Sequence, residues 1–283
     1  MRLDRYQRRR AVNVLVSALA FLCAAVTVIP LLMILGHLLS QGAKAVNLDF
    51  FTQLPKPVGE VGGGMANAIV GTLILIGLAC LVGLPIGIIG GIHLAEFGDN
   101  KTGWFIRFMS DVLNGTPSIV IGIFAYTVVV LPMRRFSAIA GGFALVIIMI
   151  PTVIRATEEL VKLVPASVRE AGLALGIPQW RVILRIVVPS AKTGIVTGAL
   201  LALARIGGET APLLFTAFGN RFWQQRLDQP IASLPVQIFT YAISPFEDWH
   251  RQAWAGALVL VAMILITSIL TRVVTKGQIR SMK

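Results

Sequence analysis

The stretch ARIGGETAP, residues 204–212, carries an arginine and a glutamate inside a run that is otherwise apolar from Gly194 to Phe218. An ionisable side chain in the hydrocarbon core of a bilayer costs on the order of 3 kcal/mol unless it is paired or faces water. Arg205 and Glu209 are four residues apart, so a continuous helix would place them on one face. Two glycines and a proline in the same stretch would loosen that helix or let another helix approach closely. We therefore expect this face to look into a protein interior or an aqueous path.

The composition of the whole chain is that of an integral membrane protein. Its 283 residues are 56% hydrophobic and 13% charged, with a mean hydropathy of +0.80. Soluble domains average about 25% charged residues. The net charge of +12 does not require a nucleic-acid partner. In membrane proteins, Lys and Arg gather in cytoplasmic loops and set the orientation of the chain.

Hydropathy predicts six transmembrane helices, because a spanning helix needs about 20 mostly apolar residues. The first is preceded by Arg8, Arg9 and Arg10, which also fits the start of a signal peptide. The apolar run that follows is too long for a signal peptide, so we expect an uncleaved anchor. The predicted spans are 12–37, 66–91, 109–131, 136–155, 193–217 and 252–273.

The distribution of basic residues predicts that both termini are cytoplasmic. With that orientation, most Lys and Arg residues fall on the cytoplasmic side, at 2–10, 101–107, 155–192 and 272–283. The adjacent Arg134 and Arg135 oppose this assignment, since it places them outside.

Glycine recurs along the second predicted span in a pattern that permits close helix contact. The positions are Gly71, Gly77, Gly83, Gly87, Gly90 and Gly91. The later segment 218–251 is apolar in part but is interrupted by prolines, so we expect it to lie on the surface or to be re-entrant rather than to span.

The third predicted span opens on Thr116-Pro117-Ser118. Pro117 suits an early helical position, and Thr116 can cap the helix N-terminus. A helix that starts within the membrane would aim free backbone N–H groups at an anion. An ordinary capped helix start at the membrane interface explains the same residues, and we leave both interpretations open.

The longest predicted cytoplasmic loop, 156–192, indicates two short helices with a sharp break between them. Ser167 and Glu170 have the spacing of a capping box. Gly176 can end the first helix in a left-handed conformation, Pro178 can start the second, and Pro189 is expected to interrupt the chain before the fifth span. A helix pair that merely joins two spans would show the same signals.

Motifs for enzymatic chemistry are missing from the sequence. There is no GxxxxGK nucleotide loop and no GxSxG nucleophile elbow. The three histidines have no metal-ligand spacing, and we interpret Cys23 and Cys80 as packing residues. We predict that the chain is not an enzyme and holds no cofactor or metal of its own. ATP and Mg²⁺, if transport uses them, would be bound by a partner ATPase.

Arg205 is the strongest candidate for a substrate contact, because a guanidinium is always charged and its donor fork matches an oxyanion. Glu209 could pair with it at rest, and its carboxylate could accept a hydrogen bond from a protonated oxyanion such as hydrogen phosphate. A purely structural Arg205–Glu209 pair is the alternative. Thr210, Thr116 and Ser118 complete the predicted substrate path.

Two motifs resemble those of known permeases. Glu170-Ala171-Gly172, Gly176, Ile186 and Pro189 resemble the EAA-G-I-LP loop of bacterial ABC importer permeases, with Gly172 in place of an alanine and Val188 in place of a leucine. The stretch from Ala204-Arg205 to Pro212-Leu213-Leu214-Phe215-Thr216-Ala217 is similar to the fifth span of the PstA family of phosphate importer permeases. Segments 68–72, 94–97 and 114–120 share that similarity, which extends over about 10–280.

The resemblance implies an all-α membrane protein with six transmembrane helices and the type I, MetI-like fold of ABC importer permeases. It implies a coupling helix in the 156–192 loop that docks on an ATPase, and Arg205 and Glu209 lining a phosphate path. It also implies a multi-pass location in the bacterial inner membrane and a complex with a PstC-like second permease, two ATPase subunits and an external phosphate-binding protein.

We predict three segments: 1–65 as the N-terminal tail, first span and outer loop, 66–274 as the importer transmembrane domain, and 275–283 as a cytoplasmic tail. Alternative functions are a permease of the same class for molybdate, sulfate or phosphonate, an ion-coupled secondary transporter acting alone, and a membrane enzyme. The coupling-like loop argues against the secondary transporter, and the missing catalytic motifs argue against the enzyme.

Overall fold

The computed structural model describes residues 5–223 and 226–280, with side chains described up to Val273 in the last helix. Basic residues predicted to be cytoplasmic at 1–4 and 281–283 lie outside the described part. Within it, all regular elements are helices, and the β contact is a single bridge between Pro55 and Gly63. The predicted all-α class is confirmed.

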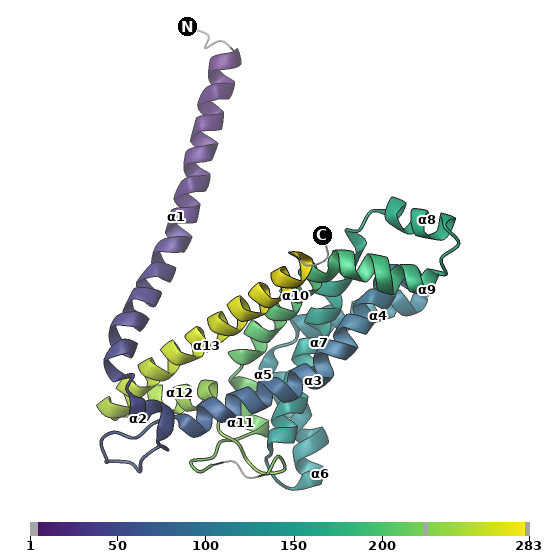
Figure 1. Ribbon diagram of the computed structural model, residues 1–283. Helices are drawn as coiled ribbons and strands as arrows, with labels where there is room; N and C mark the ends of the chain where they lie inside the picture. The colour runs from purple at the N-terminus through teal and green to yellow at the C-terminus, as the bar shows by residue number, and fades with distance from the viewer. Residues whose placement is uncertain (1–4, 224–225, 281–283) are drawn as a thin grey trace.

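The helices follow one another with short connections (Figure 1). In chain order they are α1 (Arg5–Ala45), α2 (Leu48–Thr52), α3 (Ala66–Phe97), α4 (Lys101–Gly115), α5 (Ser118–Ala125), the π-helical η1 (Tyr126–Val130), α6 (Leu131–Met133), α7 (Ala138–Lys162), α8 (Ala166–Ala174), α9 (Gln179–Val182), the π-helical η2 (Ile183–Val187), α10 (Val188–Gly207), α11 (Ala211–Thr216), α12 (Leu234–Ala242) and α13 (Glu247–Arg280).

Five helical segments are long and apolar enough to cross a membrane. They are α1, α3, α7, the continuous run Gln179–Gly207, and Glu247–Val273 of α13. The sixth candidate is a pair of helices, Lys101–Gly115 and Ser118–Met133, bent by 104° at a short break. Four of the predicted spans are therefore confirmed as continuous helices, while those at 109–131 and 193–217 are both broken.

The first break lies at Thr116-Pro117. Thr116 has the extended conformation that a residue before proline prefers, with φ −75° and ψ 132°, and it ends α4. Pro117 stands at the N-cap of α5, which begins at Ser118. The prediction of Thr116 as N-cap is thus wrong, because its hydroxyl donates backwards to the Val112 carbonyl at 2.8 Å.

The second break separates α10 from α11. The helix ends at Gly207, Gly208 is its C-cap, and Thr210 is the N-cap of α11. Pro212 lies in the first turn of α11, where its missing N–H costs no hydrogen bond. The expectation that Arg205 and Glu209 share one face of a continuous helix is therefore wrong, since Glu209 lies in the break.

Two π-helical turns directly precede prolines inside helices. In η1 the Leu131 N–H donates to the Tyr126 carbonyl, and in η2 the Val188 N–H donates to the Ile183 carbonyl. Pro132 and Pro189 follow these wider turns, which accommodate the proline ring without a helix end. The predicted interruption at Pro189 is wrong, because α9, η2 and α10 run on as one helix.

Helices α3 and α7 pack closely along a line of glycines. A Cβ atom added at Gly87 would lie 2.6 Å from Cβ of Val153, and one at Gly91 would lie 2.5 Å from Cβ of Thr157. Gly83 and Gly90 likewise face Met149 and Ile154 of α7. The predicted role of these glycines in close helix contact is confirmed, although Gly77 faces open space.

Helix α1 projects away from the rest of the molecule (Figure 1). It meets α13 near its C-terminal end, where Leu38 and Gly42 are buried and the ring of His37 packs edge-on against Trp254 at 4.9 Å. The start of α1, the end of α13 and the α8–α9 pair lie toward one end of the molecule, and α12 lies toward the other. Helix α12 is the short segment that was expected to lie on the surface or to be re-entrant.

Candidate functional site

Arg205 lies in the last turn of α10, where three helices bring polar side chains together. Its Nη1 donates to Oδ1 of Asn114 at 3.2 Å and to Oγ1 of Thr152 at 3.1 Å. The Thr152 hydroxyl donates to the same Asn114 oxygen at 3.0 Å. Asn114 lies in the last turn of α4, and Thr152 lies in α7. The guanidinium is therefore held at the point where the α4–α5 break faces the end of α10.

Glu209 lies at the limit of ion-pair distance from Arg205, with 4.0 Å between Oε1 and Nε. The Arg205 side chain is 37% exposed and that of Glu209 is 15% exposed. Within the described residues, the contacts of Arg205 use Nη1 and Nε. Nη2 can thus meet an incoming oxyanion, and the loose pairing with Glu209 leaves the positive charge incompletely neutralised.

The other predicted path residues do not hydrogen-bond to Arg205 in the described structure. Thr116 bonds to its own helix, Ser118 is the first residue of α5, and Thr210 caps α11 without a side-chain bond. The helices that follow the two breaks nevertheless pack against each other, because a Cβ added at Gly122 of α5 would lie 2.6 Å from Cα of Pro212 in α11. Broken helices that meet at a polar centre are a common site of transported ions.

Asn114 and Thr152 are site residues that the sequence prediction missed. Asn114 lies in one of the segments that carry the family similarity, but its chemistry gave no reason to place it beside Arg205. Thr152 is one polar residue in an apolar run. The sequence feature that could have identified Thr152 as a site residue is its position directly after Pro151 in a membrane span.

The α8–α9 pair is a compact, exposed helical hairpin. A Schellman motif ends α8, in which the Gly176 N–H donates to Leu173 and the Ile177 N–H donates to Gly172. Gly176 has φ +74°, so the predicted left-handed helix end is confirmed. The predicted capping box is wrong, because Pro165 is the N-cap and Ser167 already lies within α8.

Gly172 and Ile186 form the inner side of this hairpin. A Cβ on Gly172 would lie 2.9 Å from Val182 Cγ2 and 3.4 Å from Ile186 Cδ1, so an alanine at this position would require Val182 to shift. Glu170 and Ala171 are exposed, and so is Pro189. Large apolar side chains on the same hairpin are also exposed, including Leu173, Leu175, Trp180 and Leu184. An exposed apolar surface of this kind is typical of contact with another protein or with a membrane.

Arg169 ties α8 to the membrane helices. Its Nη2 lies 2.7 Å from Oε1 of Glu96, near the end of α3, and its Nε contacts both oxygens of that carboxylate. It also donates to the backbone carbonyls of Val161 and Val164. Glu96 is 5% exposed. One arginine thus joins the hairpin to the ends of two membrane helices.

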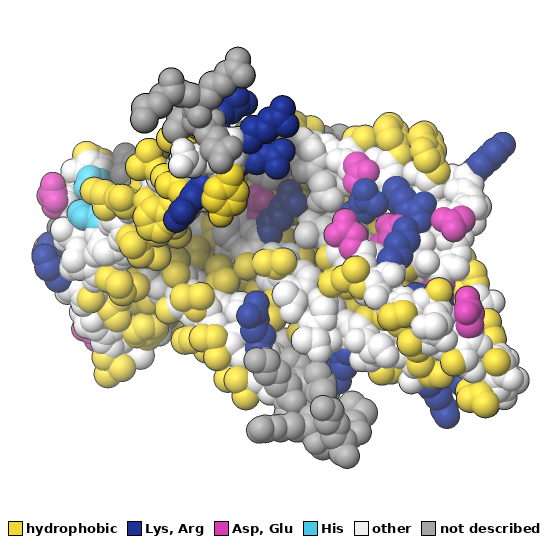
Figure 2. Space-filling view, turned by 90° about the horizontal axis from the view of Figure 1, so that it is seen from above, with side chains coloured by type: hydrophobic (Ala, Val, Ile, Leu, Met, Phe, Trp, Pro, Cys, Tyr) yellow, Lys and Arg dark blue, Asp and Glu magenta, His cyan; other side chains and the backbone are white. Residues whose placement is uncertain are grey.

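A second ionic cluster braces α4 against α7. Glu158, 2% exposed, accepts from Arg107 at 2.6 Å, from Lys162 at 2.7 Å and from Arg155 at 3.3 Å. Arg155 also bonds to Asp111 of α4. Figure 2, which views the molecule from the end that carries α8, shows basic and acidic side chains intermixed on the α8 side of this end.

These features define a class of protein: a multi-pass membrane protein with broken helices around a polar centre and an exposed helical hairpin at one end. The fold is similar to that of the MetNI methionine ABC transporter in inward-facing conformations, with a TM-score of 0.56 and 15% identity over 77% of this chain and 93% of that one. Two crystal forms of that transporter give similar values. The predicted MetI-like fold is confirmed.

Comparisons of sequence give the particular family. Residues 83–280 match the model of the binding-protein-dependent transport system inner membrane component. Relatives named phosphate transport system permease protein PstA are 48% identical in Yersinia pestis, over 86% of this chain and 83% of the relative, and 44% identical in Haemophilus influenzae, over 95% of each. PstA 1 of Mycobacterium tuberculosis is 36% identical over 91% of this chain and 86% of the relative. The chain therefore belongs to the PstA family of binding-protein-dependent inner membrane transport components.

Membership of this family confirms a multi-pass protein of the inner membrane that works as a transport component with other subunits of a transport complex.

Proposed function

We propose that the chain is the permease subunit of an ATP-driven phosphate importer, in which Arg205 contacts the anion during passage. The observation that carries this proposal is the placement of Arg205 between Asn114, Thr152 and Glu209 where two broken spans meet. The relatives, named as phosphate transport permeases, support phosphate as the anion.

The partners follow from this assignment. A PstC-like permease would form the other half of the path, two ATPase subunits would hydrolyse ATP, and an external phosphate-binding protein would deliver the anion. The α8–α9 hairpin, with Glu170 and Ala171 exposed, is the proposed ATPase contact. Residues 66–274 form the proposed transmembrane domain, after an N-terminal part at 1–65 and before a tail at 275–283.

Glu209 has a proposed role in selecting the protonation state of the anion. Its carboxylate can accept a hydrogen bond from hydrogen phosphate and repels an oxyanion that carries no proton. Sulfate carries no proton at neutral pH, so Glu209→Gln should raise the stimulation of ATP hydrolysis by sulfate relative to phosphate. An unchanged ratio in the purified complex would remove this role.

The test of the function is Arg205→Ala in the complete complex. We expect phosphate uptake into proteoliposomes to fall to background while all subunits still co-purify, because the charge that meets the anion is gone. Arg226→Gln, which removes an arginine paired with Asp228 in an exposed loop, is the matched control and should transport normally. Normal uptake by Arg205→Ala would refute the proposed function. Stimulation by molybdate or phosphonate instead of phosphate would assign another oxyanion.

A further inference from the structure

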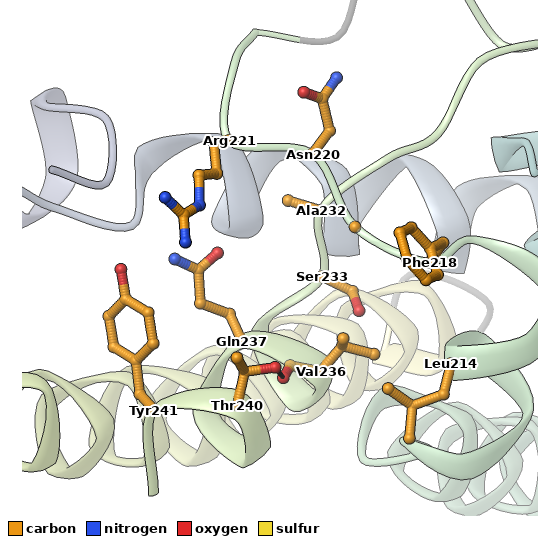
Figure 3. A pocket seen from close by; sticks show the side chains of 11 residues that line it. Leu214, Phe218, Asn220, Arg221, Ala232, Ser233, Val236, Gln237, Thr240 and Tyr241 are labelled. Atoms are coloured by element: carbon orange, nitrogen blue, oxygen red, sulfur yellow. Dashed lines mark hydrogen bonds between the residues drawn. The ribbon is translucent and has the colours of Figure 1, made fainter. Parts of the chain in front are cut away.

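A cavity of about 540 Å³ lies at the end of the molecule opposite the α8–α9 hairpin (Figure 3). Leu214 and Phe218 of the α11 end form one side, and Val236, Gln237, Thr240 and Tyr241 of α12 form another. The loop that joins these helices contributes Asn220, Arg221 and Ser233. The cavity is thus built from the segment that directly follows the Arg205 site in the chain.

Among the described residues that line the cavity, Arg221 is the one that carries a charge. Its guanidinium lies 6.0 Å from the ring centre of Trp249, and no described carboxylate forms an ion pair with it. Figure 3 shows its head group turned toward the amide of Gln237 and the phenol of Tyr241. A cation whose charge has no acidic partner favours an anion in the adjoining space.

Ser233 provides an independent indication of a ligand. It is 1% exposed, yet its hydroxyl has no hydrogen-bond partner among the described residues. It is the N-cap residue of α12, but its side chain does not cap that helix. A buried hydroxyl without a partner is unfavourable, and this one lies in the wall of the cavity, where rotation of the side chain would bring it to a bound group or water.

Two further groups of the cavity, the Tyr241 phenol and the Gln237 amide, can donate hydrogen bonds. Burial raises the pKa of the Tyr241 phenol, so this group stays protonated at neutral pH. Gln237 offers an amide, whereas the Thr240 hydroxyl already donates to the Val236 carbonyl at 2.9 Å and can therefore be replaced without loss of a donor. Arg221, Gln237, Tyr241 and Ser233 thus give the cavity hydrogen-bond donors of the kind that bind the oxygens of an anion. A water molecule takes up about 30 Å³, so the cavity can hold the anion together with bridging waters.

We propose that this cavity is a second oxyanion site, which binds inorganic phosphate before the anion reaches Arg205. The inference rests on the proposed phosphate path and adds to it a second binding site, which lies at the end of the molecule opposite the hairpin. Helix α11 connects the two sites, since it begins directly after Glu209 and Thr210 and ends beside Phe218 in the cavity wall.

The test uses a cysteine reporter in the complete complex in proteoliposomes. Thr240 is exposed and lines the cavity, so Thr240→Cys places a reactive thiol there. Replacing Cys23 and Cys80 by alanine in the same variant leaves this thiol as the only cysteine of the chain. The rate of its modification by a negatively charged thiosulfonate is measured with inorganic phosphate or with potassium chloride of equal ionic strength. We expect phosphate to slow the reaction severalfold.

Variants in the same reporter background assign the protection to the cavity. Arg221→Gln and Ser233→Ala should remove it, Arg221→Lys should keep part of it, and Arg226→Gln should keep all of it. The proposal is overturned if phosphate protects the cysteine equally well with Arg221→Gln and with Arg221 intact. It is also overturned if phosphate protects the cysteine in neither protein. Arg221→Gln that retains protection but weakens docking of the phosphate-binding protein also overturns it, because the cavity would then receive a protein side chain.

The same reporter separates this inference from the proposed function. Phosphate should still protect the cysteine when Arg205→Ala is added, since the outer cavity remains intact. Loss of uptake in Arg205→Ala without any phosphate protection of the reporter would leave the permease function standing and remove the outer site.

Discussion

At the scale of single residues, the polar centre depends on sharing one amide oxygen. Oδ1 of Asn114 accepts from both Arg205 and Thr152, and the Thr152 hydroxyl in turn accepts from Arg205. Each donor in this triangle has a defined acceptor, which fixes the direction of the guanidinium. Orientation of this kind matters for an anion contact, because a charged group that can turn away loses part of its interaction with the substrate.

Replacing Asn114 by leucine should therefore weaken transport without loss of the complex. A hydrogen bond to a charged group contributes about 1.5–3 kcal/mol, so we expect phosphate uptake to fall about 10- to 100-fold. Thr127→Val in the same bent segment is the control, because its hydroxyl bonds only to the carbonyl of Ile123. Wild-type uptake rates in Asn114→Leu would show that the amide does not orient Arg205.

At the scale of elements, the α8–α9 hairpin is joined to the membrane helices through few contacts of high specificity. Arg169 binds Glu96 with two nitrogens and the ends of the α7 region through the carbonyls of Val161 and Val164. Helix α8 itself is short, nine residues, and cannot be stable alone. A displacement of the hairpin would thus be transmitted to α3 and α7 through this arginine.

Breaking this pair should separate ATP hydrolysis from transport. Removing one partner of a buried ion pair costs about 3–5 kcal/mol, so Glu96→Gln is expected to loosen α8. We predict that phosphate uptake falls more than basal ATPase activity, measured on the same proteoliposomes. Arg226→Gln, in the exposed loop before α12 at the other end of the molecule, is the control. The double exchange Glu96→Arg with Arg169→Glu should not restore coupling, since glutamate cannot donate to the two carbonyls. Restoration would mean that the charge pair alone carries the coupling.

The seam between α3 and α7 makes a second prediction at this scale. Gly91→Ala would place Cβ 2.6 Å from the Ile154 carbonyl oxygen, and overpacking of this kind costs about 1–3 kcal/mol. We expect a lower melting temperature of the purified complex and a lower yield. Gly77→Ala in the same helix meets nothing within 4 Å and should leave both unchanged. Equal melting temperatures for the two variants would contradict the packing argument.

At the scale of the whole molecule, α1 lies apart from the bundle formed by the other helices (Figure 1). Most of its large apolar side chains are exposed, among them Phe21, Leu32 and Met33. Such a surface requires lipid or another transmembrane subunit to cover it. The start of α1 and the end of α13 lie toward the same end as the hairpin, which agrees with the predicted placement of both termini in the cytoplasm.

The orientation can be checked with reporters fused to the chain. Alkaline phosphatase is active outside the cytoplasm and a fluorescent protein folds inside it. A fusion after Lys283 should give fluorescence without phosphatase activity, and a fusion in the loop after Asn220 should give the opposite. Phosphatase activity at the C-terminal fusion would invert the orientation and place the α8–α9 hairpin where no ATPase could reach it.

Local sequence determined the helical class, the number of apolar segments, the glycine contacts of α3 and the end of α8 at Gly176. Each of these depends on the side chains of a short stretch and on its backbone preferences. The resemblance in the two motifs also gave the family correctly. Capping residues were less predictable, because Thr116 and Ser167 can bond to several nearby backbone groups and their context selects among them.

A helix start at Thr116-Pro117-Ser118 and a loosened helix at Gly207 and Gly208 were predicted, and the structure has a break at each place. The 104° bend of the third span was not predicted, because hydropathy averages over a window and does not register how far a backbone turns. Only the tertiary structure shows that Asn114, Thr152 and Arg205, far apart in sequence, form one polar centre. The sequence predicted that the charged side chain of Arg205 lies within a membrane span, where its free energy is unfavourable unless it is paired or solvated. The packing of α4, α7 and α10 decided what surrounds that charge, since hydrogen-bond partners depend on distances in space that no local pattern records.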